Sequence, residues 1–338
     1  MKLTAVVILN YNGQELLRKF LPSVVQHSAD AEIFVADNCS TDNSREILAV
    51  EFPQVKLIEI PSNLGFCGGY NYALSKVEAK YYVLLNSDVE VTKAWLPPLI
   101  SLLEVEASVA AVQPKILSYR DKGKFEYAGA GGGFIDKYGY PFCRGRLFHS
   151  LEDDTHQFDD TIPVFWASGA CMAIRAELYH QLGGLDESFF AHMEEIDLCW
   201  RLNRMQKRVM YCGESTIYHI GGATLAASNP RKTYYNFRNG LMLLIKNYKP
   251  KHLMTRLPVR IALDWIASFK FLLSGQARDS WAVVKAHFYV LIQIRRIWER
   301  RKRTSSEVKS YSVSRVYEHS IVVDYFMKGK ERFEDLEF

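Results

Sequence analysis

The chain has 338 residues and a net charge of +4, with 48% apolar and 24% charged residues. This composition is typical of a packed globular protein and excludes a disordered chain, a collagen-like repeat and a small disulfide scaffold. The six cysteines form no CxxC pair, which argues against a zinc ribbon and favours reduced thiols in a cytosolic compartment.

Strand-like and helix-like stretches alternate through the first half of the chain. We expect helices at 14–27, at 70–77 and at 96–103, and another after 40–42 that carries Ile47, Leu48 and Val50. The expected strands are 3–9, 32–36, 55–60, 80–85 and 108–113. This alternation predicts an α/β fold with a mostly parallel central sheet flanked by helices on both faces.

The second half of the chain is less regular. Residues 117–163 are rich in Gly, Tyr and Phe and predict hairpins and loops, 164–174 predicts a strand, and 192–205 and 231–248 predict helices. Beyond Pro250 we expect amphipathic helices, and the tail from about Thr304 carries no assignment. Residues 246–303 contain 14 Lys and Arg but only 3 acidic residues, which predicts a membrane surface or a polyanionic partner for this region.

Polar residues follow four of the predicted strands. Ligands of open α/β sheets bind at the carboxyl ends of the strands, so these residues predict one cleft. Each could alternatively be an ordinary turn or cap residue. No GxGxxG or Walker A motif follows the first strand, which argues against a dehydrogenase and a P-loop enzyme. The residues concerned are Asn10 and Asn12, Asp37, then Asn63, Gly65 and Asn71, and finally Asn86 and Asp88.

Several sequence blocks in the same order resemble the family 2 glycosyltransferases. The resemblance implies a GT-A fold, with a catalytic domain at 1–248 and a C-terminal helical extension and tail at 249–338. Within the catalytic domain, 1–115 would bind the nucleotide sugar and 116–248 the acceptor. The blocks are VVILNYN (6–12), VADNCSTD (35–42), NLGF (63–66), LLNSD (84–88) and FFAHMEEIDLCWR (189–201), and HIGGAT (219–224) and YYNFRN (234–239) resemble the rhamnosyltransferase-like branch.

The resemblance also implies roles in donor binding. Asp37 would accept the imide N–H of uracil or thymine, in a pocket lined by Asn10 and Asn12. Asp88 matches the last acid of the metal-binding DxD motif, whose first acid is Asn86 here, and His219 would complete the shell of a Mg²⁺ or Mn²⁺ ion. Asp88 could instead belong to a turn, and His219 could be structural. The remaining donor-binding residues would be Asn63, Gly65, Asn71 and Arg238, although Arg238 could equally be a solvated helix charge.

A third set of residues is expected at the acceptor side. Alignment with the family favours Glu195 as the base that deprotonates the acceptor hydroxyl, with Glu194 orienting its neighbours. The simpler alternative is that acids in a first helical turn favour the helix dipole. Trp166 and Gly169 resemble the segment that lines the acceptor, where Trp166 could stack on a sugar ring or lie in the core.

These residues predict an inverting, metal-dependent glycosyltransferase. The donor would be dTDP-rhamnose or a UDP-hexose, and the acceptor a saccharide or lipid-linked hydroxyl in bacterial surface polysaccharide synthesis. The basic, aromatic C-terminal helices predict a cytoplasmic protein that is peripheral at the inner face of the cell membrane. The alternatives are a sugar-phosphate nucleotidyltransferase and an inactive membrane-associated scaffold. No nucleic-acid-binding motif is present.

Overall fold

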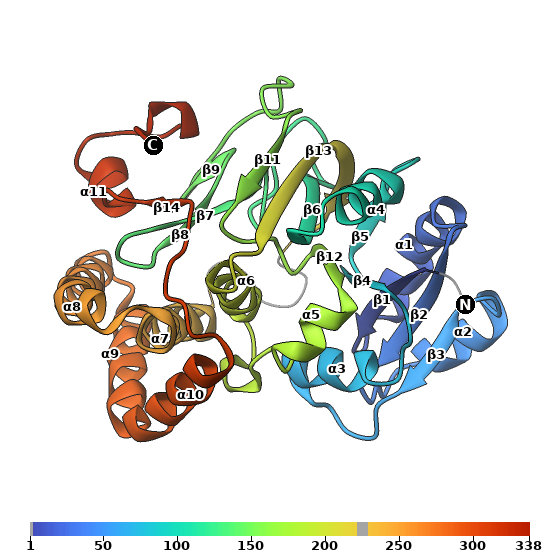
Figure 1. Ribbon diagram of the computed structural model, residues 1–338, viewed down its shortest axis with the longest axis horizontal. Helices are drawn as coiled ribbons and strands as arrows, with labels where there is room; N and C mark the ends of the chain where they lie inside the picture. Colours follow the sequence, from blue (N-terminus) through green and yellow to red (C-terminus); the bar gives the residue numbers. More distant parts are fainter. Residues whose placement is uncertain (1–2, 222–228) are drawn as a thin grey trace.

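The computed structural model describes residues 3–221 and 229–338 (Figure 1). Residues 222–224 of the predicted block 219–224 lie outside the described residues. Among the described residues, nine strands form a central sheet in the order β11-β13-β6-β12-β4-β1-β2-β3, with β5 paired to β13. These strands are β1 (Thr4–Asn10), β2 (Ala31–Asp37), β3 (Lys56–Glu59), β4 (Tyr81–Asn86), β5 (Val89–Val91), β6 (Val109–Ser118), β11 (Thr161–Val164), β12 (Cys171–Arg175) and β13 (Arg208–His219).

The sheet is mostly parallel, as the sequence predicts. Strands β4, β1, β2 and β3 pair in parallel with one another, and β6 pairs in parallel with β13. Strand β12 is antiparallel to both β4 and β6, so it joins two groups of strands that run in the same direction. The carboxyl ends of six strands therefore lie at one edge.

Helices cover both faces of this sheet. They are α1 (Gln14–His27), α2 (Ser44–Glu51), α3 (Gly65–Leu74), α4 (Leu96–Val105), α5 (Ala176–Gln181), α6 (Glu194–Arg204) and α7 (Pro230–Asn247), with a 3-10 turn η1 (Glu187–Phe189) before α6.

Alternate side chains of β1 belong to two different hydrophobic cores, one on each face of the sheet. Val6 and Ile8 belong to the core that includes α1, α2 and α4. Ala5 and Val7 belong to the larger core that includes α3, α5, α6 and α7. This alternation is the period-2 pattern of a strand that is buried on both faces.

The residues expected to form hairpins and loops build a second sheet. Strands β7 (Gly133–Asp136), β8 (Pro141–Cys143), β9 (Arg146–Leu147) and β10 (Ser150–Leu151) form an antiparallel meander. Its fifth strand, β14 (Val316–Tyr317), comes from the C-terminal tail and pairs in parallel with β7. The tail thus completes a sheet that begins in the predicted acceptor half.

The C-terminal region continues with α8 (Pro250–Leu273), α9 (Ala277–Ile292), α10 (Ile294–Glu307), α11 (Ile321–Phe326) and a final 3-10 turn η2 (Phe333–Asp335). Figure 1 shows α8, α9 and α10 gathered beside α7, at the end of the molecule opposite β1–β3. The expected domain boundary after residue 248 falls between α7 and α8. Within the described ranges, no helix combines the length and the apolar character needed to cross a bilayer.

Two of the expected elements are wrong. The helix expected at 70–77 is α3, which begins five residues earlier, at Gly65. Gly68 and Gly69, which were expected to precede the helix, belong to its first turns. A Cβ atom at Gly69 would lie 2.7 Å from Leu9 Cδ1, so the missing side chain lets α3 pack closely on β1. The single strand expected at 164–174 is two strands, β11 and β12, separated by the loop that carries Trp166 and Gly169.

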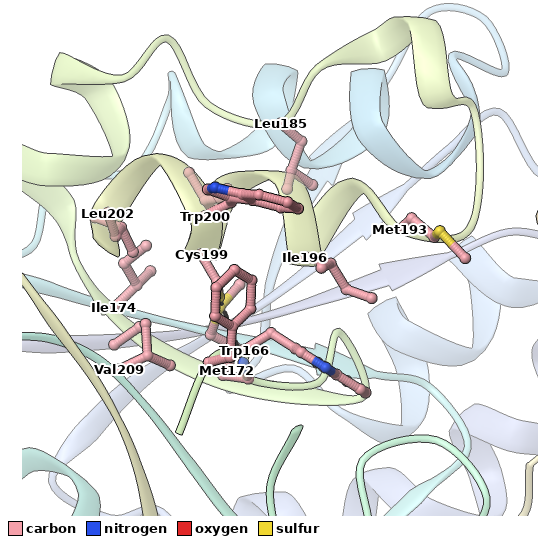
Figure 2. Packing of buried hydrophobic residues seen from close by; sticks show 14 of the residues in the cluster. Trp166, Met172, Ile174, Leu185, Met193, Ile196, Cys199, Trp200, Leu202 and Val209 are labelled. Atoms are coloured by element: carbon pink, nitrogen blue, oxygen red, sulfur yellow. Dashed lines mark hydrogen bonds between the residues drawn. The ribbon is translucent and has the colours of Figure 1, made fainter. Parts of the chain in front are cut away.

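Trp166 lies in the core, the second of its two expected positions. It is 4% exposed, and its indole N–H donates to the carbonyl of Phe134 at 2.8 Å. Figure 2 shows it among the apolar side chains that pack under α6, together with Met172, Ile196 and Cys199. The structure thus gives Trp166 a packing role beneath the helix that begins with Glu194 and Glu195.

Candidate active site

The first predicted pocket residues form a row across the carboxyl edge of the sheet. Strand pairing places Asn10 opposite Asp37 and Leu9 opposite Asn86. The Asn10 amide donates to Asp37 Oδ1 at 3.1 Å. Among the described residues, the buried Asn10 Oδ1 atom has no hydrogen-bond partner. A buried acceptor without a partner is costly and calls for an explanation, such as a bound water or a ligand.

A shallow pocket of about 400 Å³ opens next to this row. Its lining includes Asn12, Thr41 and Asp42, which come from the loops after β1 and β2. Asn12 has a φ of 51° and its side-chain oxygen accepts the Thr41 N–H at 2.8 Å. The Asp42 carboxylate accepts N–H bonds from Gln14 and Ser44, the first residues of α1 and α2, and so caps both helices.

Asn63 and Gly65 shape the neighbouring start of α3. Asn63 Oδ1 accepts hydrogen bonds from the Asn38 amide at 3.1 Å and from the Gly65 N–H at 2.9 Å. Asn38 in turn accepts the Leu64 N–H. Gly65 has a φ of +70°, a conformation that glycine adopts without strain. These two asparagines therefore connect the loop after β2 to α3.

Asp88 and His219 come together through the pairing of β5 with β13. His219 Nε2 lies 3.1 Å from Asp88 Oδ1 and 3.4 Å from the Asn86 amide nitrogen. On its other side, His219 Nδ1 lies 3.3 Å from a carboxylate oxygen of Glu126. Burial lowers the pKa of His219, but the carboxylates of Asp88 and Glu126 outweigh it and raise the pKa to about 10. In this arrangement His219 carries a positive charge between two acids.

The donor atoms at this position fit a divalent cation that also binds phosphate. Asp88 supplies a carboxylate oxygen, the ligand type that Mg²⁺ and Mn²⁺ prefer, and His219 adds a ring nitrogen next to it. Among residues 3–221 and 229–338, no group of three or more His, Cys, Asp or Glu side chains is arranged to hold a metal. Mg²⁺ commonly uses one or two protein ligands and completes its shell with phosphate and water. The residues present match this mode of binding.

The first turn of α6 carries two carboxylic acids with unusual surroundings. Glu194 is buried and Glu195 is half-buried. Within the described structure, the Oε2 atoms of both are buried without a hydrogen-bond partner. Burial raises the pKa of Glu195 to about 7, and burial together with the Glu195 charge raises the pKa of Glu194. A carboxyl group with a pKa near neutrality suits a general base.

The loop before α6 is strained. Phe190, His192 and Met193 have φ values of 66°, 68° and 71°. Phe190 is the centre of a γ-turn, since its ψ is −56° and the Ala191 N–H donates to the Phe189 carbonyl at 2.8 Å. This form of γ-turn is rare and strained, and strained residues gather at active sites and ligand clamps.

Asn239 and Arg238 of α7 hold this strained loop in place. The Asn239 amide donates to the carbonyls of Ala191 and His192 at 2.8 and 2.7 Å and to that of Phe189 at 3.1 Å. The buried Arg238 guanidinium donates to the Phe189 carbonyl at 2.6 Å. In the described structure these contacts connect Arg238 to the loop before α6, whereas the sequence predicts a diphosphate contact.

Asn71 also has structural partners. Its amide donates to the Leu185 carbonyl at 2.9 Å, and its oxygen accepts from the Leu185 N–H and from the Tyr179 hydroxyl. It therefore fixes the loop between α5 and η1. The expected donor-binding role for Asn71 finds no support in these contacts.

Gly169 belongs to a loop that lies between the end of β4 and the acids of α6. A Cβ atom at Gly169 would lie 3.9 Å from Glu195 Cβ and 3.5 Å from Phe66 Cζ, so this residue is next to the candidate base. The following residue, Ala170, accepts the Asn86 N–H at 3.0 Å. One loop therefore contacts both the row of donor residues and Glu195.

Two residues of the site were not assigned a role from the sequence. Glu126 lies in the irregular region after β6, where no motif marks it. His192 is half-buried, and its Nε2 atom is buried without a partner in the part of the chain that the structure describes. Burial lowers the pKa of His192 to about 4, so its ring is neutral. Its place two residues before Glu194 was the available signal.

Comparison with curated proteins finds glycosyltransferases. The chain is 27% identical over 218 residues to the low-salt glycan biosynthesis hexosyltransferase Agl10 of Haloferax volcanii, which covers 62% of this chain and 64% of the relative. It is 26% identical over 237 residues to the N-acetylglucosaminyl-diphospho-decaprenol L-rhamnosyltransferase of Mycobacterium tuberculosis, covering 63% of this chain and 75% of the relative. The chain thus spans just under two thirds of the first relative.

Comparison with solved structures confirms the GT-A fold. The mannosyltransferase PcManGT from Pyrobaculum calidifontis, in complex with GDP-Man and Mn²⁺, aligns with a TM-score of 0.53 at 14% identity, covering 90% of this chain and 86% of that one. GalNAc-T7 with UDP, GalNAc and Mn²⁺ aligns with a TM-score of 0.58 at 16% identity, covering 75% of this chain and 49% of that one. The family model described as glycosyl transferase family 2 matches residues 5–183. The chain therefore belongs to glycosyltransferase family 2, as its sequence blocks predict.

Proposed function

We propose that the protein is an inverting glycosyltransferase that moves a sugar from a nucleoside-diphosphate donor to a hydroxyl group of a saccharide or lipid-linked acceptor. The observation that carries this proposal is the contact of one loop, Gly169–Ala170, with both Glu195 and Asn86. Through this loop a candidate base lies near the residues expected to bind the donor.

In this proposal, Asp37 and Asn10 recognise the base of the nucleotide. The Asp37 carboxylate is an acceptor-only group, which suits the imide N–H of uracil or thymine. Asp37 is 1% exposed and accepts a hydrogen bond from Asn10. Binding of a nucleobase therefore requires a local rearrangement or a shared hydrogen bond. Asn12 and Thr41 line the open pocket beside them.

Asp88 and His219 would hold Mg²⁺ or Mn²⁺ together with the diphosphate of the donor. The ion would neutralise the charge that develops on the leaving diphosphate. Two solved structures of the same fold carry Mn²⁺ in their descriptions. His219 must be neutral to bind a metal through Nε2, so binding would release a proton.

Glu195 would accept the proton of the acceptor hydroxyl. Its half-buried carboxylate has an oxygen without a partner within the described residues, which leaves it free to accept that proton. An attacking hydroxyl on the face opposite the leaving diphosphate would invert the configuration at the anomeric carbon. Glu194 would orient its neighbours or the acceptor.

The relatives suggest the substrates. One is named as a rhamnosyltransferase that acts on N-acetylglucosaminyl-diphospho-decaprenol, and another as an O-antigen biosynthesis protein of Myxococcus xanthus. We therefore propose dTDP-rhamnose or a UDP-hexose as donor and a lipid-linked saccharide as acceptor, used in surface glycan synthesis. The reaction would take place in the cytoplasm, at the inner face of the cell membrane.

A transfer assay tests this function. The purified chain is incubated with each of a panel of nucleoside-diphosphate sugars, an N-acetylglucosaminyl-diphospho-lipid and Mn²⁺, and nucleoside diphosphate and glycosylated lipid are measured. Formation of both products, abolished by chelation, supports the proposal. Pyrophosphate release from a sugar phosphate and a nucleoside triphosphate, without transfer, would indicate a nucleotidyltransferase instead.

A further inference from the structure

Helix α8 presents its polar side inward and its apolar side outward. Arg260, Asp264 and Ser268, spaced four residues apart, are buried. The large apolar residues between and after them are exposed: Trp265, Ile266, Phe269, Leu272 and Leu273, with Leu273 73% exposed. A surface helix of a water-soluble protein shows the opposite pattern.

Hydrogen bonds fix α8 in this orientation. Asp264 Oδ1 accepts from Arg260 Nε and from the Tyr140 hydroxyl, both at 2.8 Å. The Arg260 guanidinium also donates to the Gly139 carbonyl at 3.1 Å. Rotating the helix to bury its apolar side would break the bonds to Tyr140 and Gly139 and leave these buried polar groups without partners, which is unfavourable. The outward apolar surface is therefore built into the fold.

Neighbouring elements extend the same surface. The Trp265 ring lies 5.4 Å from the ring of His287 on α9, so the two helices adjoin there. Lys270 Nζ lies 4.3 Å above the Phe326 ring of α11. We call this surface the α8–α9 face; its exposed apolar residues are Trp265, Ile266, Phe269, Leu272 and Leu273 on α8, Trp281, Phe288, Leu291 and Ile292 on α9, and Phe326 on α11. Large exposed apolar side chains gathered on adjoining helices indicate an interaction site.

The charges around the face decide what it binds. Exposed cations stand among its apolar residues and beside it: Lys270, Arg278, Lys285, Arg295 and Arg296. Residues 254–303 carry eleven Lys and Arg and three acids: Asp264, which is buried and paired, Asp279, which accepts a hydrogen bond from Thr233, and the exposed Glu299. A second copy of the chain on this face would bring like charges together, whereas an anionic lipid surface attracts them.

We propose that the α8–α9 face lies in the headgroup region of an anionic bilayer. Tryptophan side chains favour this interface, and Lys and Arg on an amphipathic helix pair with anionic lipid. Helix α9 packs on α7, with Tyr289 and Tyr234 ring centroids 6.4 Å apart, and α7 carries Asn239, which holds the loop before Glu195. On the proposed function, this docking would bring the active site to a lipid-linked acceptor.

Vesicle sedimentation of the full chain tests the proposal without donor or acceptor. The vesicles contain phosphatidylcholine alone, or phosphatidylcholine with phosphatidylglycerol, at low and high salt. The test variant is Ile266→Ser/Phe269→Ser, at two exposed positions. The matched control is Val50→Ser/Val105→Ser, also exposed apolar residues, on α2 and α4. Arg295→Gln/Arg296→Gln tests the charge contribution.

We expect the wild type and the control to bind vesicles that contain phosphatidylglycerol and to bind phosphatidylcholine alone at least about tenfold more weakly. The serine variant should lose at least about tenfold in partitioning, and the glutamine variant, which removes two of the five exposed cations, should bind anionic vesicles more weakly and with a smaller salt dependence. Failure of the wild type to bind anionic vesicles, or equal binding by the serine variant, would overturn the proposal. A salt-stable dimer that dissociates in the serine variant and does not bind vesicles would assign the face to a second copy. None of these outcomes depends on glycosyl transfer.

Discussion

His219 Nε2 lies 3.1 Å from Asp88 Oδ1, although the two residues are 131 positions apart in the sequence. The contact exists because β13 crosses beside β5, with His219 paired to Val89. In the metal-free protein it is an ion pair between a protonated ring and a carboxylate. The same two atoms are the ligands that we propose for a divalent cation.

Replacing Asp88 by Asn should weaken metal binding. The amide is a poorer and uncharged ligand for Mg²⁺ or Mn²⁺, so we expect the affinity for Mn²⁺ in the presence of a nucleoside diphosphate to fall at least about tenfold, or ~1.4 kcal/mol. The measurement is the amount of free Mn²⁺ by electron paramagnetic resonance. Asp121→Asn, at a side chain that is 57% exposed, serves as the control. Unchanged Mn²⁺ affinity in Asp88→Asn would contradict the assignment.

Replacing Glu195 by Gln should abolish most transfer while leaving the donor site intact. Loss of a general base lowers kcat by about 10²–10⁴-fold. Donor binding, measured by calorimetry, should remain at the wild-type value. Glu177→Gln, an exposed position on α5, is the control. Full activity in Glu195→Gln would reject Glu195 as the base and leave Glu194 as the candidate.

The pKa of Glu195 predicts a pH dependence that can be measured without substrate. Because the folded-state pKa of Glu195 is raised to about 7, the group stabilises the fold fully below its unfolded pKa and loses that contribution as pH rises through about 7. The wild type should therefore become less stable relative to Glu195→Gln between about pH 5 and 8, by up to about 2 kcal/mol. Denaturant unfolding of both proteins across this range is the measurement. Parallel stability curves would show that Glu195 is already ionised at pH 5.

Ionisation of Glu195 should raise catalytic activity with increasing pH, although it lowers the stability of the fold. A base must be ionised to accept a proton, so kcat/KM should rise with pH through about 7 and then level off. The residual activity of Glu195→Gln should lack this rise. A wild-type profile that is flat from pH 5 to 9 would be inconsistent with Glu195 as the base.

Replacing Asn239 by Ala should loosen the strained loop before α6. The carbonyls of Phe189, Ala191 and His192 would lose a shared donor, so we expect a loss of about 2–3 kcal/mol in unfolding free energy. Amide exchange at residues 190–193 should accelerate. Asn236→Ala, at a half-buried position on the same helix, is the comparison. Equal stability of the two variants would show that the loop does not depend on Asn239.

The stability of a Lys246→Met variant tests how the C-terminal helices support the site. Its ammonium bonds Asp186 at 2.7 Å and Asp197 at 2.8 Å, and Arg300 of α10 also bonds Asp186. Removing one partner of a buried charge network leaves acids uncompensated, so Lys246→Met should cost about 3–5 kcal/mol of stability. Chemical denaturation measures this, with the exposed Lys302→Met on α10 as control. Arg201 Nε also donates to Asp197 at 2.9 Å, so a cost below about 1 kcal/mol would show that Arg201 and Arg300 suffice to compensate the two acids.

The sequence predicts the central sheet well because strands and helices there are marked by local patterns of apolar residues. The apolar run of β1 and the helical spacing of α1 are each readable without knowledge of the rest of the chain. The start of α3 was misjudged, because glycines within a helix look like a loop until the close approach to Leu9 is seen. The inverted orientation of α8 likewise depends on Tyr140 and Gly139, more than 100 residues earlier in the chain.

The candidate site residues also divide into those that local sequence patterns mark and those whose roles depend on long-range contacts. Motif order predicts Asp88, His219 and Glu195 as site residues, because their neighbours in sequence mark them. The contacts that decide the roles of Asn71, Trp166 and Arg238 are long-range and buried, so only the structure assigns them to the support of loops and core. Glu126 was missed because the loop that places it beside His219 carries no periodic pattern.

Thermal unfolding with nucleotide sugars tests the central claim most directly. The wild type and Asp88→Asn are each heated with a panel of nucleoside-diphosphate sugars, with Mn²⁺, Mg²⁺ or a chelator. A ligand present at ~100 times its Kd adds about 2.7 kcal/mol to the stability of the folded state. We expect one uridine or thymidine diphosphate sugar to raise the Tm of the wild type only with metal, and to raise that of Asp88→Asn far less. A folded wild-type protein whose Tm no nucleoside-diphosphate sugar changes would contradict the assignment as a nucleotide-sugar-dependent transferase.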